Sequence, residues 1–408
     1  MAETIRPQPA LRRLPRNVWA VSLTSFFMDI SSEMVINILP LFLSNVLGVK
    51  TNLIGLIEGL AESTASLLKL FSGWFSDRLR ARKWLAVAGY GISALAKPFF
   101  YFANTWGIVA AVRWADRVGK GVRTAPRDAL VADSVDERQR GLAFGFQRAA
   151  DTAGAMLGLL IALVVVWIAQ SSSVALGQDT FRTVVLISLF PALLAVLVLA
   201  FGAKDVPVTG QRLAPKFAFR LLGRRFMVFM LIVGLFDLGN SSDAFLVLRA
   251  QERGLSVTGI LSMLVVFNLV YTLVSAPAGS LSDRLGRRRL IVGGWLVYAA
   301  IYLGFGLARS AWQIYALYAV YGLYYGLAYG TSKAMVADLV PDALRGTAYG
   351  TYNAVLGILD FPASLIAGLL WQGAGGWPGF GASAPFLFAA ALAFLAALLM
   401  AFWMPRAR

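Results

Sequence analysis

Apolar segments bounded by basic or Pro/Gly-rich turns recur twelve times along the chain. Each is long enough for an α-helix to cross a hydrocarbon core of about 30 Å. The first and the seventh contain polar interruptions. The predicted spans cover residues 17–46, 52–78, 83–103, 106–131, 139–169, 181–202, 225–252, 257–283, 288–308, 311–338, 344–373 and 384–404. The pattern predicts an all-α membrane protein with twelve transmembrane helices.

The longest polar connection divides the spans into two sets of six. It runs from about Ala203 to Arg225 and contains Pro207, Pro215 and six cations. We therefore predict two six-helix bundles. The predicted organisation is a tail over 1–16, a bundle over 17–202, a linker over 203–224, a second bundle over 225–404 and a tail over 405–408.

The composition supports a membrane protein over a soluble or a disordered one. Hydrophobic residues make up 58% of the 408 residues and charged residues 14%. A soluble chain of this size could not bury so much apolar surface, and disordered chains have low hydrophobicity. The net charge of +16 would raise the question of nucleic acid in a soluble protein, but the cations cluster between apolar segments. We therefore expect a lipid bilayer, and no nucleic acid, as partner.

The distribution of cations predicts the topology. Of the 37 Lys and Arg residues, 23 lie on the side of the N-terminus and 5 on the opposite side. The positive-inside rule then places both termini in the cytoplasm, which requires an even number of spans. The basic segment before the first span has no small-residue cleavage site, so we expect a membrane segment there and not a signal peptide.

Two residue types are absent, and their absence limits the chemistry. The chain has no Cys and no His. Disulfides, thiolates and imidazole are thereby excluded, so any proton handling near neutral pH falls to carboxylates. No nucleophile-base set or metal cluster is visible. We expect no enzyme, no metal site and no cofactor beyond a proton gradient.

Two motifs recur in the second half at almost the same offset. The segment Gly73-Trp-Phe-Ser-Asp77-Arg78-Leu79, in the predicted loop after the second span, returns at an offset of 206 as Gly279-Ser-Leu-Ser-Asp283-Arg284-Leu285. After the fourth span, the segment from Asp133 to Arg140 returns at an offset of 205 as Asp338 to Arg345. Because six is even, the halves have the same orientation, as in transporters built from parallel repeats.

These residues resemble the signature of the major facilitator superfamily, Gly-x-Leu-Ala-Asp-Arg-x-Gly-Arg-Lys. The second half matches closely, and the first half departs at Arg80 and Ala81. Glycine permits tight turns, and a carboxylate beside cations can latch the bundle; the alternative is that the cations serve topology alone. The residues predicted to form this cytoplasmic gate are Gly73, Asp77, Arg78, Arg82, Asp133, Arg140, Gly279, Asp283, Arg284, Gly286, Arg287, Arg288, Asp338 and Arg345.

The resemblance implies the twelve-helix fold and a place in the inner (cytoplasmic) membrane of a bacterium. The segment Arg117-Val-Gly-Lys120-Gly121 is similar to the family's Arg-x-x-Gln-Gly motif, whose Arg is linked to proton transfer in proton-coupled members. The fifth span lacks the Gly-Pro pair of drug antiporters, which weakens that assignment. The chain resembles a bacterial subgroup whose substrate is unassigned.

Charged residues inside the spans are the main candidates for function. An ionised side chain at bilayer depth costs about 2.5 to 3.5 kcal/mol, so each is a functional hypothesis. The candidates for proton coupling or substrate contact are Asp29, Glu33, Glu58, Glu62, Lys97, Arg113, Arg117, Arg148, Asp151, Asp237, Asp243, Lys333, Asp360, Tyr318, Tyr321 and Tyr325. Most lie in the first half, where we expect the coupling chemistry.

Two pairs of acids are spaced to share a helix face. Asp29 with Glu33, and Glu58 with Glu62, lie four residues apart. Like charge and desolvation favour the protonated form of a carboxyl group, which can then load and release a proton. The candidate countercharges are Lys97, Arg113 and Arg148, while Asp116 could pair with Arg113 or Lys120 on its own helix. The alternative is a set of fixed ion pairs that hold helices together.

Three further features have structural consequences. The segments from Asp237 to Asp243 and from Asp360 to Pro362 are predicted helix breaks beside a cavity. Tyrosines recur at helical spacing in the tenth span, where they either contact an organic substrate or simply pack. Gly322 and Gly326, on an adjoining line with Gly330, favour close helix packing.

We therefore expect a secondary transporter of a small organic solute that works by alternating access and is coupled to protons, with export favoured. The alternatives are a uniporter without proton coupling and a transport-inactive membrane sensor. Mixed acids, bases and tyrosines leave an organic cation, an organic anion and a zwitterion open as substrate. A monomer is expected.

Overall fold

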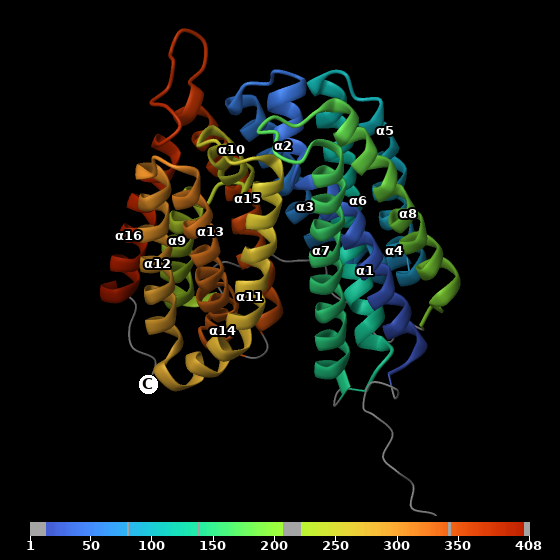
Figure 1. Ribbon diagram of the computed structural model, residues 1–408. Coiled ribbons are helices and arrows are strands. Elements are labelled where there is room, and N and C mark those ends of the chain that lie inside the picture. The colour runs from blue at the N-terminus through green and yellow to red at the C-terminus, as the bar shows by residue number, and fades with distance from the viewer. Residues whose placement is uncertain (1–13, 80, 137–138, 207–221, 342–343, 404–408) are drawn as a thin grey trace, which may run out of the picture.

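The computed structural model describes residues 14–79, 81–136, 139–206, 222–341 and 344–403, with the backbone alone at 73, 74, 77, 276, 278–284, 328–330 and 346. Within these residues the chain is almost entirely helical and has no strand. Figure 1 shows the helices as two groups side by side, α1 to α8 in blue and green and α9 to α16 in yellow to red. The all-α fold in two bundles is thereby confirmed.

The first six predicted spans are all present as helices. They are α1 (Arg16–Ile36) with α2 (Leu39–Leu41) and the π-helix η2 (Phe42–Val46), α3 (Thr51–Leu79), α4 (Arg82–Ala96) with α5 (Pro98–Tyr101), α6 (Trp106–Asp133), α7 (Arg140–Gln170) and α8 (Gln178–Gly202). The first span is interrupted at Asn37 and Ile38, close to Pro40. Proline lacks an amide hydrogen, so it is tolerated at the start of the new helix.

The second six spans repeat the plan. They are α9 (Gly223–Gly239) with α10 (Ala244–Glu252), α11 (Val257–Leu285), α12 (Arg287–Leu307), α13 (Ala311–Tyr324) with the π-helix η5 (Tyr325–Tyr329) and α14 (Gly330–Asp338), α15 (Arg345–Gln372) and α16 (Ala384–Trp403). The linker predicted over 203–224 falls largely on residues 207–221, which lie outside the described part.

Eight of the spans in the described part are long and apolar enough to be recognised as membrane-crossing by composition alone. The other four are built on α3, α4, α6 and α13. Helices α3 and α6 fall short because Glu58, Glu62, Arg113, Asp116 and Arg117 lie along them. These residues pair with one another inside the first bundle, so they do not require the helices to leave the membrane.

One of the two predicted helix breaks is present and the other is wrong. The chain leaves helical geometry between Gly239 and Ala244, as predicted. Helix α15 in contrast continues through Pro362. It is supported there by α3, whose Gly55 and Gly59 let the backbone at Ser364 and Phe361 approach closely. Packing against a neighbouring helix can compensate for the hydrogen bond that a proline removes.

The repeated Gly-x-x-x-Asp-Arg motifs do not lie in loops, contrary to the prediction. Residues 73–79 form the last turns of α3, and residues 279–285 those of α11. The connections that follow are very short. Gly286 alone separates α11 from α12 and has φ +88°. Glycine adopts this conformation at little cost, so the turn needs no longer loop.

Glycines bring helices together inside the first bundle. Gly89 of α4 and Gly119 of α6 face each other, and a Cβ added at Gly119 would lie 2.6 Å from the Gly89 carbonyl oxygen and from Ser93 Oγ. Small residues at such contacts maximise van der Waals packing, which replaces the hydrophobic effect between helices in lipid. The contact fixes α6, which carries most of the bundle's buried charges.

We predict that Gly119→Ala lowers the free energy of unfolding by about 1 to 3 kcal/mol, because the added methyl group overpacks the contact. Thermal unfolding of the purified protein in detergent measures the change. Gly91→Ala is the matched control, since a Cβ at Gly91 meets no atom within 4 Å. Equal stability of Gly119→Ala and the parent protein would contradict the packing argument.

Candidate functional site

A cavity of about 540 Å³ lies between the two bundles. Its walls come from α1 to α3, α6 and α7 of the first bundle and from the break before α10, α11, η5 and α15 of the second. The charged residues that line it are Glu58, Glu62, Arg113, Lys120, Arg148, Asp243 and Asp360. The cavity therefore joins helices far apart in sequence and carries charges of both signs.

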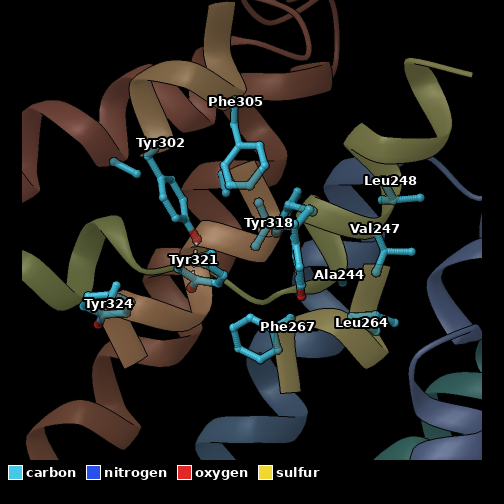
Figure 2. Close-up of a cluster of buried hydrophobic side chains, with 14 of the residues drawn as sticks. Ala244, Val247, Leu248, Leu264, Phe267, Tyr302, Phe305, Tyr318, Tyr321 and Tyr324 are labelled. Carbon is cyan, nitrogen blue, oxygen red and sulfur yellow. Dashed lines mark hydrogen bonds between the residues drawn. The ribbon is translucent and has the colours of Figure 1, made fainter. Parts of the chain in front are cut away.

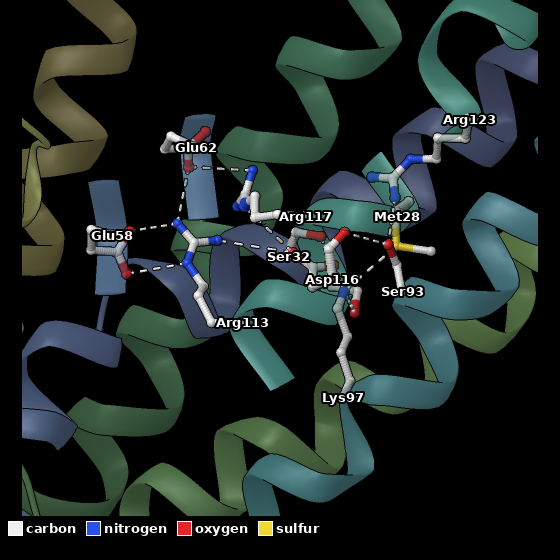
Figure 3. A network of polar contacts seen from close by, with 11 residues as sticks. Met28, Ser32, Glu58, Glu62, Ser93, Lys97, Arg113, Asp116, Arg117 and Arg123 are labelled. Atoms are coloured by element: carbon white, nitrogen blue, oxygen red, sulfur yellow. Dashed lines mark hydrogen bonds and ion pairs between the residues drawn. The ribbon is translucent and has the colours of Figure 1, made fainter. Parts of the chain in front are cut away.

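A buried ion network between α3 and α6 forms one wall (Figure 3). Arg113 binds Glu58 through two hydrogen bonds of 2.6 and 3.1 Å and contacts Glu62 at 3.0 Å. Arg117 lies 3.5 Å from Glu62. The two acids are one turn apart on α3, as are the two arginines on α6, so each pair presents one face to the other helix. Arg113 is therefore the countercharge for this pair of acids.

Asp116 is held by arginines of its own helix, as one of the predicted alternatives had it. Its carboxylate lies 3.7 Å from Arg117 and 3.9 Å from Arg113. The Ser93 hydroxyl of α4 donates to the Asp116 carbonyl and accepts from Arg123 at 2.6 Å. This chain of contacts ties α4 to α6 and extends the network away from the cavity.

Lys97 and Asp151 have partners that the sequence did not reveal. Lys97 is buried at the end of α4 and donates to the hydroxyls of Ser31 and Ser32 of α1, at 2.5 and 3.0 Å. It thus joins two helices and pairs with no acid within 4 Å among the described residues. The cation beside Asp151 is Arg127, at 3.9 Å, while Arg148 lines the cavity.

Asp29 and Glu33 differ from the acids of α3. Both are half-buried on α1, outside the cavity lining, and no ion pair within the described residues neutralises either. Glu33 accepts a hydrogen bond from Asn37 at 2.8 Å. Asp29 has Asp151, Glu33, Lys120 and Arg123 as its electrostatic neighbours. One predicted pair of acids is therefore fixed by arginines, and the other is not.

Among the described lining residues, those of the second bundle include two acids and no cation. Asp243 lies in the break between α9 and α10 and lines the cavity there. Asp360 lies on α15. Asp237 is buried behind it, and one carboxylate oxygen of Asp237 has no hydrogen-bond partner in the described part. Lys333 lies on α14, away from the lining.

The tyrosines of the tenth span divide between packing and the cavity. Tyr318 and Tyr321 are buried in the aromatic cluster shown in Figure 2, beside Phe267 and Tyr302. Tyr325 lines the cavity. Gly322 lets α13 approach the α11 backbone, as a Cβ there would lie 2.9 Å from the Phe267 carbonyl. The glycine line therefore serves helix packing.

The two repeated motifs meet in space within each bundle. Arg82 at the start of α4 pairs with Asp133 at the end of α6, and Arg287 pairs with Asp338 at 2.8 Å. Both pairs are related by the offset of 205. They join helices of the same bundle, so in this conformation they do not latch one bundle to the other.

The remaining predicted gate residues are only partly described. Arg78, Arg140 and Arg345 lie at the end of α3 and the starts of α7 and α15, and Arg288 donates to the Ala401 carbonyl at 2.5 Å. The side chains of Gly73, Asp77, Gly279, Asp283 and Arg284 lie outside the described residues. Their role as a gate stays a prediction.

The bundles are hydrogen-bonded to each other at the end away from the chain termini, where Figure 1 shows them close together. Asn45 and Gln251 exchange two amide hydrogen bonds of 3.0 and 2.7 Å. Their positions differ by 206, so they are equivalent residues of the two repeats. Around this pair, further bonds join Thr51 to Gln372, Asn52 to Gly373, Val257 to Ser173 and Thr258 to Ser171. One end of the cavity is therefore closed by neutral polar contacts.

Several lining residues were not among the predicted site residues. They are Ile36, Asn37, Pro40, Lys120, Asn240, Ser241, Ser242, Ala244, Val247, Phe267, Asn268, Tyr271 and Ser364. Lys120 carried a usable signal, because it is a cation inside a predicted span. Asn268 is likewise polar within an apolar stretch. Phe267 and Tyr271 carried none, since aromatic residues are common throughout the spans.

Comparisons with known proteins agree with this architecture. The sequence model of the Major Facilitator Superfamily matches residues 21–242 and again 227–408. An uncharacterised MFS-type transporter of Methanocaldococcus jannaschii is 34% identical over 397 residues, 96% of each chain. The cis,cis-muconate transport protein of Acinetobacter baylyi is 24% identical over 72% of this chain and 73% of its own. The crystal structure of a D-xylose-proton symporter has the same fold, with a TM-score of 0.74 at 17% identity, over 96% of this chain and 98% of that one.

We predict that Arg113→Gln destabilises the protein by about 3 to 5 kcal/mol, because Glu58 is then left buried without its countercharge. The double variant Glu58→Gln with Arg113→Gln recovers part of the loss, since neither charge remains. Unfolding in detergent measures both. Arg309→Gln is the control, as Arg309 is exposed and its side chain makes no ion pair in the described part; its effect stays below about 1 kcal/mol. A double variant no more stable than Arg113→Gln would contradict the pairing.

Proposed function

The chain belongs to the major facilitator superfamily and serves the transport of a solute across a membrane, and on that premise we propose that it is a proton-coupled secondary transporter. It moves a small organic solute by alternating access of one cavity to the two sides of the membrane. The observation that carries the proposal is the cavity of about 540 Å³ between the bundles, lined by ionisable groups from both.

The arrangement of the bundles supports alternating access. The contacts around Asn45 and Gln251 close the cavity at one end, while the bundles are apart at the end with the termini (Figure 1). Equivalent positions of two parallel repeats meet at this closure. A rocking of one bundle against the other would open this end and close the opposite one.

The distribution of cations supports an orientation. The side of the termini has 23 Lys and Arg residues and the other side has 5. By the positive-inside rule, this distribution favours a location in the cytoplasmic membrane with both termini in the cytoplasm. The cavity then faces the cytoplasm in this conformation. In this conformation the cavity exchanges solute with the cytoplasm, which is the loading state of the exporter that we propose.

The pairing of the acids supports a location for proton coupling. Releasing Glu58 from Arg113 would leave buried charges unpaired, at a cost of about 3 to 5 kcal/mol. A change of protonation at Asp29 or Glu33 breaks no ion pair in the described part, so it carries no such cost. We therefore assign proton loading to Asp29 and Glu33 of α1, and a fixed structural role to the pairs between α3 and α6.

We predict that a pH gradient of one unit drives about tenfold accumulation of the solute per coupled proton, since one pH unit is worth about 1.36 kcal/mol. The double variant Asp29→Asn with Glu33→Gln abolishes this accumulation, so that the solute only equilibrates across the membrane. A stabilising solute is first found by thermal-shift screening across metabolites at two pH values. Its movement is then measured in proteoliposomes.

Asp179→Asn is the matched control for that experiment, because Asp179 is fully exposed at the start of α8. Unchanged accumulation in the double variant would show that the coupling acids are misassigned. Equilibration without accumulation in the parent protein would identify a uniporter instead.

We predict that joining residues 45 and 251 arrests transport, because the closed end of the cavity can then no longer open. The chain contains no cysteine, so Asn45→Cys with Gln251→Cys introduces the only two thiols. A short bifunctional thiol reagent should stop solute exchange in proteoliposomes, while the single variants and a monofunctional reagent should not. Exchange that continues after complete cross-linking would rule out opening at this end.

A further inference from the structure

The cavity lining separates charge between the two bundles. Its cations, Arg113, Lys120 and Arg148, all come from the first bundle. From the second bundle, the charged residues in the described lining are Asp243 and Asp360. A solute between the bundles therefore meets cations on one side only, and on the other side acids without a cation among them.

Internal pairing leaves only some of these charges available to a ligand. Arg113 is already paired with Glu58 and Glu62, and Glu62 also contacts Arg117. Lys120 forms no ion pair within 4 Å in the described part, although Glu62 and Asp29 are among its electrostatic neighbours. Asp243 and Asp360 likewise form no ion pair there. Arg148, the third cation of the lining, is engaged in an interaction of its own. The charged groups of the lining without an ion pair in the described part are thus the ammonium group of Lys120 and, on the opposite wall, the carboxylates of Asp243 and Asp360.

Aromatic side chains surround the acidic wall. Phe267, Tyr271 and Tyr325 line the cavity beside Asp243, with ring centroids 5.4 to 6.4 Å apart. Tyr321 stacks on Phe267, with ring centroids 5.5 Å apart, and extends this group of rings into the aromatic cluster (Figure 2). An aromatic face attracts an organic cation, most strongly where water is displaced. This wall is suited to an ammonium group.

We propose that the transported solute is a small dipolar molecule, with an amine that binds the acidic wall at Asp243 and an acidic group that binds Lys120. This assignment rests on the transport function proposed above and names its substrate class. The cavity volume of about 540 Å³ lies in the range of sites for small organic molecules.

A solute with a single charge fits this cavity less well. An organic cation would satisfy Asp243 but leave Lys120 desolvated without a partner. An organic anion would leave both acids unpaired. An unpaired charge that a ligand has shielded from water opposes binding. The cavity therefore selects a dipolar solute over an organic cation and over an organic anion.

Two matched sets of probes test the proposal. The first is 4-(aminomethyl)benzoate with 4-methylbenzylamine and 4-methylbenzoate, and the second is L-phenylalanine with phenethylamine and 3-phenylpropionate. Within each set the shape is nearly constant and the charge changes. Binding to the full-length purified protein is measured by isothermal titration calorimetry. In at least one set the dipolar member should bind about tenfold or more tightly than both relatives, the effect of one charge-assisted contact.

Substitutions assign each charge to its wall. Asp243→Asn should weaken binding of the dipolar and amine probes about tenfold and leave binding of the carboxylate probe unchanged. Lys120→Gln should weaken binding of the dipolar and carboxylate probes about tenfold and leave binding of the amine probe unchanged. Asp179→Asn and Lys204→Gln, both at exposed positions, are the charge-matched controls. Unfolding temperatures confirm that each variant is folded, so a loss of affinity cannot be mistaken for a loss of structure.

The proposal is overturned if a singly charged probe binds as tightly as the dipolar one in both sets, if no dipolar probe binds, or if Asp243→Asn weakens all three members equally. Failure of this proposal is distinguishable from failure of the transport proposal. If the imposed pH gradient moves a singly charged solute, the substrate class is wrong and proton-coupled transport stands. If dipolar probes bind as expected but no solute moves, the substrate class stands and transport fails.

Discussion

The need to keep ionised groups out of hydrocarbon determines how this protein is built. An Arg at bilayer depth must be paired or must face a cavity, because no water is available to solvate it. Arg113 meets this requirement with two acids of α3, and the pairing holds α3 against α6. Lys97 meets it with two hydroxyls of α1. Because Arg113, Glu58 and Glu62 also line the cavity, the same residues hold the first bundle together and shape the cavity.

The two repeats share a scaffold but not a chemistry. Helices α3 and α11 begin and end at positions that differ by 206, and α6 and α13 begin at positions that differ by 205. At these offsets Glu58 and Glu62 correspond to Leu264 and Asn268, and Arg113 and Lys120 correspond to Tyr318 and Tyr325. The ion network of the first bundle is thus replaced by the aromatic cluster of the second at equivalent places. This substitution makes one wall of the cavity ionic and the other aromatic with two acids.

The spans could be predicted from the sequence, but the partners of the charged residues could not. Span boundaries such as 181–202 and 257–283 lie within a few residues of α8 and α11, because hydropathy reports directly on burial in lipid. The predicted break at Pro362 is absent, since it depends on the packing of α15 against α3. The pairing of Arg82 with Asp133 joins residues 51 positions apart and needed the fold. Arg287 and Asp338 follow Arg82 and Asp133 at the same offset of 205. This shared offset was a signal that the two motifs contact each other in each half.

The energies of these contacts decide which part of the molecule can move. Within each bundle the ties include Arg113 with Glu58, and Arg249, which is fully buried and donates to Glu252 and to the Phe305 and Gly306 carbonyls. Breaking a buried pair of this kind costs about 3 to 5 kcal/mol. The bundles are joined by neutral hydrogen bonds of about 0.5 to 1.5 kcal/mol each, such as those between Asn45 and Gln251, and by the packing of α3 against α15. Contacts within a bundle are thus individually stronger than the hydrogen bonds between the bundles. We therefore expect each bundle to move as a rigid unit, with the contacts between the bundles breaking and re-forming during the transport cycle.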